Sequence, residues 1–266
     1  RRKTADWTVV LIALCHCRVL WRLSDLSSLE CETAGTGVRK LRQEETLSAA
    51  TETVIAEPET EESTEETVIY CDPVYDFGQL HEQNEDIYAW IVVPGTQVDY
   101  PLLQSGTDNY YLDYNLDHSK GYPGCIYTNQ CNRKDFSDYN TVLYGHNMKN
   151  GSMFGSIHSF EDETFFDGHP YIYVYTENER LTYEIYEAAK FTDVYIPSEY
   201  VISSKDDRDQ FLADVREKVS DNKLHVREDM EIGEEDRLIT LSTCVSGERN
   251  HRYLVIGVLV ETALYR

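Results

Sequence analysis

RLITLSTCVSGERNHRYLVIGVLVE, residues 237–261, contains two apolar runs separated by a short polar loop. The runs, Leu238–Thr243 and Tyr253–Glu261, are rich in β-branched and aromatic residues, which is typical of strands. Between them lie Gly247 and Asn250, residue types that favour turns. We therefore expect the two runs to pair as an antiparallel β-hairpin.

Cys244 stands where the first of these strands ends and the loop begins. A cysteine at that place is partly exposed and rigidly aimed, as a nucleophile should be. Arg252 opens the second strand, and in a hairpin its guanidinium, with five donors, would lie near the thiol and suit an oxyanion. The alternative for Arg252 is an ordinary solvated surface charge, and Arg249 in the same loop is a rival for the role.

A thiol needs a base or a cationic neighbour to become a nucleophile, and eight histidines compete for that position. His146 stands out, because NTVLYGHNMKNGSMFG, residues 140–155, places it where an apolar strand meets a Gly- and Asn-rich loop. His251 is the main competitor, although its side chain should point to the face opposite to that of Arg252. His81 lies in a predicted helix, and the others outside the N-terminal stretch lie in polar contexts that indicate no fixed orientation: His118, His158, His169 and His225.

Short apolar runs bounded by Gly, Asn, Asp and Pro also occur upstream of the hairpin and predict six further strands. Apolar residues at helical spacing predict one helix over Asp72–Trp90 and another over Ser203–Ser220, the latter between the sixth and seventh strands. Eight short strands with few helices favour a mainly β fold, a closed or nearly closed barrel. The six upstream strands are Ala89–Val93, Gln97–Leu103, Gly124–Tyr127, Thr141–Tyr144, Tyr171–Tyr175 and Leu181–Phe191.

The formal net charge of the chain is −24. Such an acidic surface repels phosphate backbones, and the sequence has no basic stripe with interleaved aromatic residues, so we expect no nucleic-acid partner. Cationic partners, such as amine-bearing or lysine-rich substrates, are favoured instead. We expect no metal and no other cofactor, because no His, Asp or Glu cluster has the spacing of metal ligands.

The seven cysteines are odd in number and irregularly spaced, which argues against a disulfide framework. Cys125 and Cys131 are close enough in sequence to bridge in an oxidising compartment. Their geometry decides whether they do, so the sequence leaves their disulfide state open.

The N-terminal part of the chain differs from the rest. Three basic residues precede an apolar stretch, Trp7–Leu23, so residues 1–32 are predicted to be a single membrane anchor with the following domain outside the cell. An amphipathic surface helix is the alternative. Residues 33–66 are rich in Glu and Thr and predict an acidic flexible linker. Residues 67–266 would then form the catalytic domain of a single-pass protein of the cell membrane.

Three of these motifs together resemble a known family. TLSTC at 240–244, Arg252 a short loop later, and YGHNMKNGSMF at 144–154 are similar to the motifs of the sortases, specifically class B. The resemblance extends over about residues 70–266. It includes the helical segment before the barrel and the helix at 203–220, whose position between the sixth and seventh strands is similar to the class B hallmark.

The resemblance implies an eight-stranded sortase-type barrel that acts as a cysteine transpeptidase. Cys244 would attack the carbonyl after a threonine in a C-terminal sorting signal and form a thioacyl enzyme. His146 would protonate the leaving amine and later deprotonate the incoming one. Arg252 would hold the oxyanion or the substrate backbone. An amine of a cell-wall peptidoglycan precursor would then resolve the thioester.

The resemblance also implies the substrates, which would be surface proteins with an NPQTN-like sorting signal. Ser242 lies two residues before the nucleophile, on the same strand face, and resembles a position that contacts substrate. Asn109, in GTDNYYL, is similar to another such position. Each of the two could instead make only local hydrogen bonds in a strand or turn.

Two other functions remain open at this level. The chain could be a cysteine endopeptidase, in which water resolves the thioester instead of an amine. It could also be an inactive surface-binding domain whose acidic face recruits a cationic partner.

Overall fold

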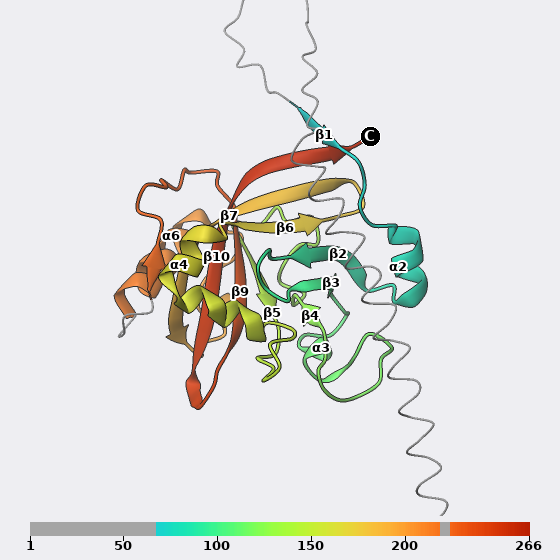
Figure 1. Ribbon diagram of the computed structural model, residues 1–266, viewed down its shortest axis with the longest axis horizontal. Helices are drawn as coiled ribbons and strands as arrows, with labels where there is room; N and C mark the ends of the chain where they lie inside the picture. The colour runs from blue at the N-terminus through green and yellow to red at the C-terminus, as the bar shows by residue number, and fades with distance from the viewer. Residues whose placement is uncertain (1–67, 219–223) are drawn as a thin grey trace, which may run out of the picture. The chain divides into compact units, whose positions relative to one another are not determined.

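The computed structural model describes residues 68–218 and 224–266, and its centre is a closed β-barrel (Figure 1). Neighbouring strands follow the order β10-β9-β5-β4-β3-β2-β6-β7, and pairing between β10 and β7 closes the ring. Closure satisfies the backbone on both sides of every strand in the ring. The predicted mainly β, eight-stranded barrel is confirmed. Its strands are β2 (Ile87–Val92), β3 (Asp99–Leu103), β4 (Ile126–Tyr127), β5 (Asn140–Tyr144), β6 (Tyr171–Tyr175), β7 (Glu179–Thr192), β9 (Leu238–Val245) and β10 (Glu248–Tyr265).

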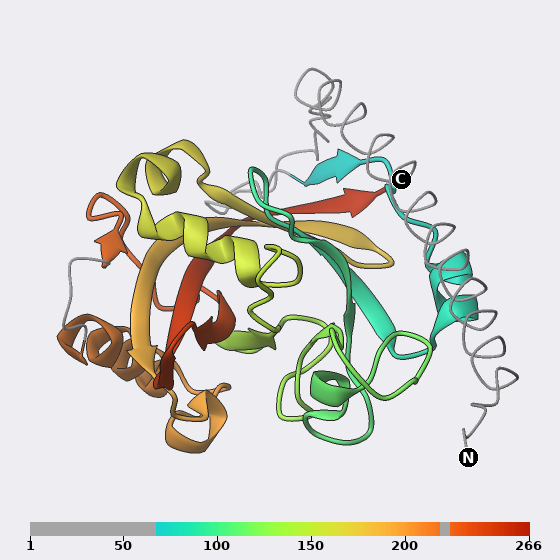
Figure 2. The same cartoon turned by 60° about the horizontal axis from the view of Figure 1, so that its bottom comes forward.

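In the described part of the chain, two short strands and six helical segments surround this ring. The strand β1 (Ile69–Cys71) pairs with β10, and β8 (His225–Val226) pairs with β7. In Figure 2, η1 and α4 lie on one side of β7 and β10, and α6 lies on the other. As predicted, α6 is inserted between the sixth and seventh strands of the barrel. The helical segments are α2 (Phe77–Gln83), α3 (Tyr110–Asp113), η1 (Gly155–Glu161), α4 (Glu163–Gly168), α5 (Ile196–Glu199) and α6 (Lys205–Lys218).

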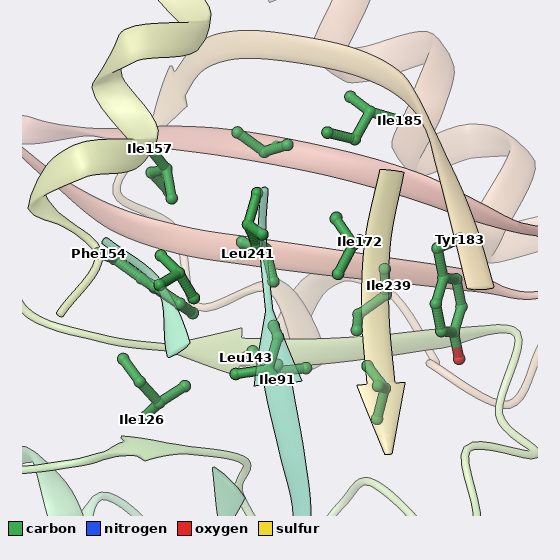
Figure 3. Packing of buried hydrophobic residues seen from close by; sticks show 14 of the residues in the cluster. Ile91, Ile126, Leu143, Phe154, Ile157, Ile172, Tyr183, Ile185, Ile239 and Leu241 are labelled. Carbon is green, nitrogen blue, oxygen red and sulfur yellow. The ribbon is translucent and has the colours of Figure 1, made fainter. Parts of the chain in front are cut away.

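The barrel interior is filled by apolar side chains from every strand of the ring (Figure 3). In β9, Ile239 and Leu241 point inward, as period-two alternation requires. Phe154 and Ile157, at the start of η1, reach into the same cluster. Each large apolar side chain that is fully buried contributes about 1.5–3 kcal/mol, so this cluster rigidly supports the strand ends.

The outer face of the hairpin is buried as well. Leu238 of β9 and Leu254 of β10 point away from the interior cluster and pack with Phe211 and Val215 of α6. The alternation in RLITLSTC therefore does not mark a solvent-exposed face. It separates two apolar layers, because α6 covers the outside of the barrel at this point.

The helix predicted over Asp72–Trp90 is wrong in its second half. The helix α2 ends at Gln83, and Ile87 already belongs to β2. The backbone of Asn84 is extended, and its buried amide donates to the carbonyl oxygen of Leu116 at 2.8 Å. This long-range contact, together with the pairing of β2 with both β3 and β6, overrides the local helical spacing.

The single-pass membrane localisation expected from the sequence is corrected by the structure. Within residues 68–218 and 224–266, no helix combines the length and apolar character needed to cross a bilayer. The longest helix in these two ranges, α6, has 14 residues. It measures about 21 Å, less than the hydrocarbon thickness of about 30 Å, and it is highly charged. The segments assigned to an anchor, 1–32, and to a linker, 33–66, lie outside the described residues.

One carboxylate lies buried between the barrel and α6. Glu187 of β7 is 0% exposed, and within residues 68–218 and 224–266 neither of its side-chain oxygens has a partner at hydrogen-bond distance. It forms an ion pair with Arg216 of α6, whose Nε lies 3.6 Å from Glu187 Oε2. Burial outweighs this attraction and raises the pKa of Glu187 to about 7. The proton-bound form is therefore favoured in the folded protein below about pH 7.

We expect Glu187→Gln to remove a pH-dependent loss of stability. Because the folded-state pKa is raised, wild-type stability is complete below about pH 4.5 and falls as the pH rises through about 7. The variant should match the wild type near pH 4.5 and exceed it by about 3 kcal/mol at pH 8. Urea denaturation at both pH values measures the difference. The control is Glu184→Gln on the same strand, where the partly exposed carboxylate should contribute less than about 1 kcal/mol. A Glu187→Gln effect that is equal at both pH values would contradict this account.

Candidate active site

The predicted hairpin places Arg252 directly opposite Cys244. The strands β9 and β10 pair antiparallel, and these two residues are partners in the register. Cross-strand partners share a face and have Cβ atoms about 5 Å apart. The connecting turn contains Gly247 with φ of 82°, a left-handed conformation that favours glycine. Thiol and guanidinium side chains therefore start from neighbouring points on one face of the barrel wall.

His146 reaches the same end of the wall from β5. The strands β5 and β9 are parallel, and Tyr144 is the register partner of Ser242. The N–H of Gly145 donates to the carbonyl of Ser242 at 3.3 Å, so the pairing continues past the end of β5. His146 and Cys244 each stand two residues beyond that register pair. The sequence separates them widely, and the parallel pairing brings their backbones together.

Gly145 leaves room for two buried side chains next to His146. A Cβ atom at this position would lie 2.5 Å from Ile126 Cδ1 and 2.8 Å from Phe154 Cδ2, both fully buried side chains. The hydroxyl of Thr243 donates to the carbonyl of Gly145 at 2.8 Å. The residue before His146 is thus fixed by packing on one side and by β9 on the other.

The ring of His146 is oriented by a backbone carbonyl. The sequence did not predict this contact. His146 Nε2 lies 2.8 Å from the carbonyl oxygen of Leu112. A carbonyl only accepts, so Nε2 carries a proton, and Nδ1 is left to gain and lose the second one. The ring of Tyr122, which is 76% exposed, covers His146 with the centroids 4.8 Å apart. The competitor His251 instead pairs with Glu248 at 3.1 Å.

The cysteines differ sharply in exposure. Cys244 is exposed, whereas Cys125 is buried and burial raises the pKa of its thiol to about 12, so it is a poor nucleophile. Cys131 is exposed but unbridged. Cys125 faces the carbonyl of Tyr114 and Cys131 faces the hydroxyl of Tyr195, each at 3.7 Å. The structure therefore contains both as free thiols rather than as the disulfide that the sequence left open.

Arg252 lies beside a small pocket in front of Cys244. Its Nη1 donates to the carbonyls of His251 at 3.0 Å and of Arg249 at 3.4 Å, so the side chain bends over the hairpin loop. Arg249 also lines the pocket, but only Arg252 is in register with the thiol. The pocket has a volume of about 330 Å³ and is lined by Cys244, Val245, Gly247, Glu248, Arg249 and Arg252.

The two predicted substrate-contacting residues lie in different settings. Ser242 is buried in β9 between Tyr144 and its β10 partner, directly behind Cys244. Asn109 precedes α3, and its Oδ1 accepts hydrogen bonds from the Tyr127 hydroxyl at 3.0 Å and the Asn129 amide at 3.2 Å. The structure thus places Ser242 close to the candidate catalytic residue Cys244. The Asn109 oxygen is instead bonded within a separate hydrogen-bond network.

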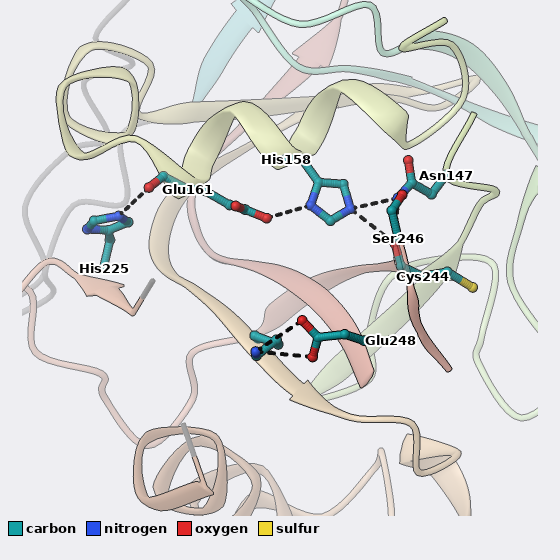
Figure 4. A network of polar contacts seen from close by, with 8 residues as sticks. Asn147, His158, Glu161, His225, Cys244, Ser246 and Glu248 are labelled. Carbon is teal, nitrogen blue, oxygen red and sulfur yellow. Dashed lines mark hydrogen bonds and ion pairs between the residues drawn. The ribbon is translucent and has the colours of Figure 1, made fainter. Parts of the chain in front are cut away.

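His158 is a second histidine at this site, and it contacts the backbone of Cys244 (Figure 4). The carbonyl oxygen of Cys244 lies 2.7 Å from Asn147 Nδ2 and 3.1 Å from His158 Nε2. His158 Nδ1 in turn lies 2.7 Å from Glu161 Oε1. The expectation that His158 lacks a fixed orientation is wrong. Its spacing of three residues from Glu161, which brings the two side chains together on a helical turn, was the available signal.

Metal ligation has no visible support in the part of the chain that the structure describes. There, no group of three or more His, Cys, Asp or Glu side chains is arranged to hold a metal ion. The chemistry available at this site is that of a thiol, an imidazole and a guanidinium.

Residues 91–260 match the sortase domain. This chain belongs to the sortase family. Sortases are cysteine transpeptidases that act on surface proteins carrying sorting signals and serve cell-wall anchoring. The three strand ends described above therefore lie within the sortase domain of this chain.

The relatives of this sortase domain belong to class B, as the sequence motifs predicted. The chain is 34% identical to sortase B of Listeria monocytogenes over 62% of its own length and 65% of that protein, which is less than two thirds of the relative. It is 28% identical to sortase B of Staphylococcus aureus, over 70% of this chain and 75% of that protein. The crystal structure of Clostridium perfringens sortase B superposes with a TM-score of 0.62 at 30% identity, covering 70% of this chain and 100% of that one.

Proposed function

We propose that residues 67–266 form a transpeptidase that cleaves a C-terminal sorting signal after threonine and joins the protein to a peptidoglycan amine. The observation that supports this most is the register of the strand ends. Cys244 and Arg252 are cross-strand partners, and His146 extends from the parallel neighbour of β9. On this proposal, a thiol, a base and a guanidinium from three strands would act on one acyl carbon.

In the first step the Cys244 thiol gives its proton to Nδ1 of His146, and the sulfur attacks the carbonyl carbon of the threonine residue. A C–S bond forms, the carbonyl oxygen becomes an oxyanion, and Arg252 would donate to it. When the oxyanion collapses, the peptide C–N bond breaks. The leaving amine takes a proton from Nδ1 of His146, while Nε2 stays bonded to the Leu112 carbonyl. The product is a thioacyl enzyme.

In the second step an amine of a peptidoglycan precursor attacks the thioester. Nδ1 of His146 accepts the proton that this amine loses, the C–S bond breaks, and the released Cys244 thiolate takes that proton back from His146. A new amide bond joins the surface protein to the cell wall. The acidic character of the chain, with a net charge of −24, favours an approaching amine that is still protonated.

Two further residues are proposed to contact the sorting signal, which we expect to be NPQTN-like. Ser242 would support the peptide next to the nucleophile. For Asn109, the oxygen is occupied by Tyr127 and Asn129, which leaves its amide nitrogen to donate to a peptide carbonyl.

The direct test is mass spectrometry of Cys244 after exposure of the chain to a small set of sorting peptides. An NPQTN-type peptide should add the mass of its acyl part to the tryptic fragment that contains Cys244. A matched peptide with alanine in place of threonine should add little. Supplying a peptidoglycan-type amine should remove the adduct and yield the joined product.

Other outcomes would lead to different conclusions. Product formation at the same rate with and without the amine would indicate an endopeptidase that uses water. An adduct on another cysteine, or none with any peptide, would count against the nucleophile and favour a binding domain.

A further inference from the structure

The carbonyl oxygen of Cys244, near the end of β9, is held by side chains from another part of the chain. It lies within hydrogen-bond distance of two side chains, Asn147 and His158, and both come from the segment that follows β5. His158 is held on its other side by Glu161, and its ring stacks on the buried ring of Tyr253 with the centroids 4.9 Å apart. These contacts form a clamp on the main chain of the nucleophile.

The contacts of the clamp form one continuous chain of hydrogen bonds. A proton on His158 Nδ1 goes to Glu161 Oε1 at 2.7 Å, and the lone pair on Nε2 accepts from the Asn147 amide, whose Nδ2 lies 3.0 Å away. The other proton of that amide goes to the Cys244 carbonyl at 2.7 Å, and Ser246 Oγ lies 3.2 Å from the same nitrogen. The chain thus runs from Glu161 through His158 and Asn147 to the backbone of Cys244.

We propose that His158 is a positioning residue, which Glu161 holds in place so that His158 orients the Asn147 amide on the backbone of Cys244. This inference rests on the proposed function of Cys244 as the nucleophile. A peptide unit is planar, so a fixed donor on its carbonyl oxygen restricts rotation of the whole 244–245 unit. Figure 4 shows the Cys244 sulfur pointing away from His158, so the ring acts through the main chain and not on the sulfur.

The pair is shielded enough for this role. The side chains of His158 and Glu161 are only 21% and 24% exposed, so salt screens them less than it screens surface ions. A hydrogen bond to a carboxylate, such as that from His158 to Glu161, is roughly twice as strong as one between neutral groups. A misplaced nucleophile slows the chemical step more than it weakens substrate binding. The effect of the clamp should therefore appear in kcat and not in KM.

Two variants of His158 and one matched control test the clamp. His158→Leu removes both hydrogen bonds of the ring, and we expect kcat for sorting-peptide cleavage to fall about 10-fold with KM changed less than about 2-fold. His158→Gln keeps an amide oxygen that can accept from Asn147 and should recover kcat to within about 3-fold of the wild type. The control is His169→Leu, since His169 also stacks on an aromatic ring and bonds a backbone carbonyl, that of Phe165, away from Cys244. It should leave kcat within about 2-fold.

A second readout follows the ring itself. In the resting wild type, NMR should show the ring of His158 with a proton on Nδ1, and Glu161→Leu should let that proton move to Nε2. Thermal unfolding checks that all variants are folded. Equal loss of kcat in His158→Leu and His169→Leu, or a wild-type ring with no proton on Nδ1, would overturn the proposal. If the wild type cleaves no peptide at all, the proposed function fails, and the NMR result still decides whether the clamp exists.

Discussion

Cys244→Ala is expected to lower the rate of peptide transfer more than about 10⁴-fold, because no acyl-enzyme bond can form without the sulfur. The side chain is exposed at the end of β9, so its removal creates no core cavity and should leave the melting temperature unchanged. Chromatography of the joined product, together with the intact mass of the protein, measures the loss.

The matched control is Cys131→Ala, which removes another exposed thiol. This variant should retain transfer activity within about 2-fold of the wild type. Residual transfer above about 1% in Cys244→Ala, or a comparable loss in Cys131→Ala, would show that another group is the nucleophile.

His146→Gln should lower kcat for sorting-peptide cleavage about 10³-fold, within the usual range for a lost general acid–base. The glutamine amide can still donate to the Leu112 carbonyl that holds the ring of His146. Local structure is therefore preserved while proton transfer at Nδ1 is lost. Steady-state cleavage of a fluorogenic NPQTN-type peptide measures kcat and KM separately.

His81→Gln is the control for this substitution. His81 Nε2 also lies 2.8 Å from a backbone carbonyl, that of Ile87, but at the end of α2 outside the site. A loss of kcat caused only by changing a hydrogen bond from a histidine to a backbone carbonyl should appear equally in both variants. If the two lose kcat to the same extent, His146 has a structural role and the proton must be carried by another group.

Local patterns were sufficient to locate most of the barrel. The eight predicted strands all exist, and the run Tyr171–Tyr175 has the predicted bounds. The strands β1 and β8 were missed, because two or three residues are too few for a periodic signal. The helix over residues 72–90 was extended too far, since helical spacing and the alternation of β2 overlap there and only strand pairing separates them.

The site residues also divide into those that local sequence brings together and those that only strand pairing brings together. Cys244 and Arg252 lie on one hairpin, so their proximity follows from a turn and a short sequence separation. His146 was singled out by its place at the end of an apolar run, but its closeness to Cys244 depends on the parallel pairing of β5 with β9. His158 was dismissed, because its partner on the Cys244 backbone lies 86 residues away.

Periodicity, turn residues and three short motifs thus sufficed to indicate the barrel, the inserted helix and the membership of the sortase family. These signals act between near neighbours in the chain, where backbone geometry dictates which side chains share a face. The orientation of His146 on the Leu112 carbonyl and the clamp on Cys244 arise only in the folded chain. A backbone carbonyl is common to all residues, so no residue type reveals which one a distant side chain will meet.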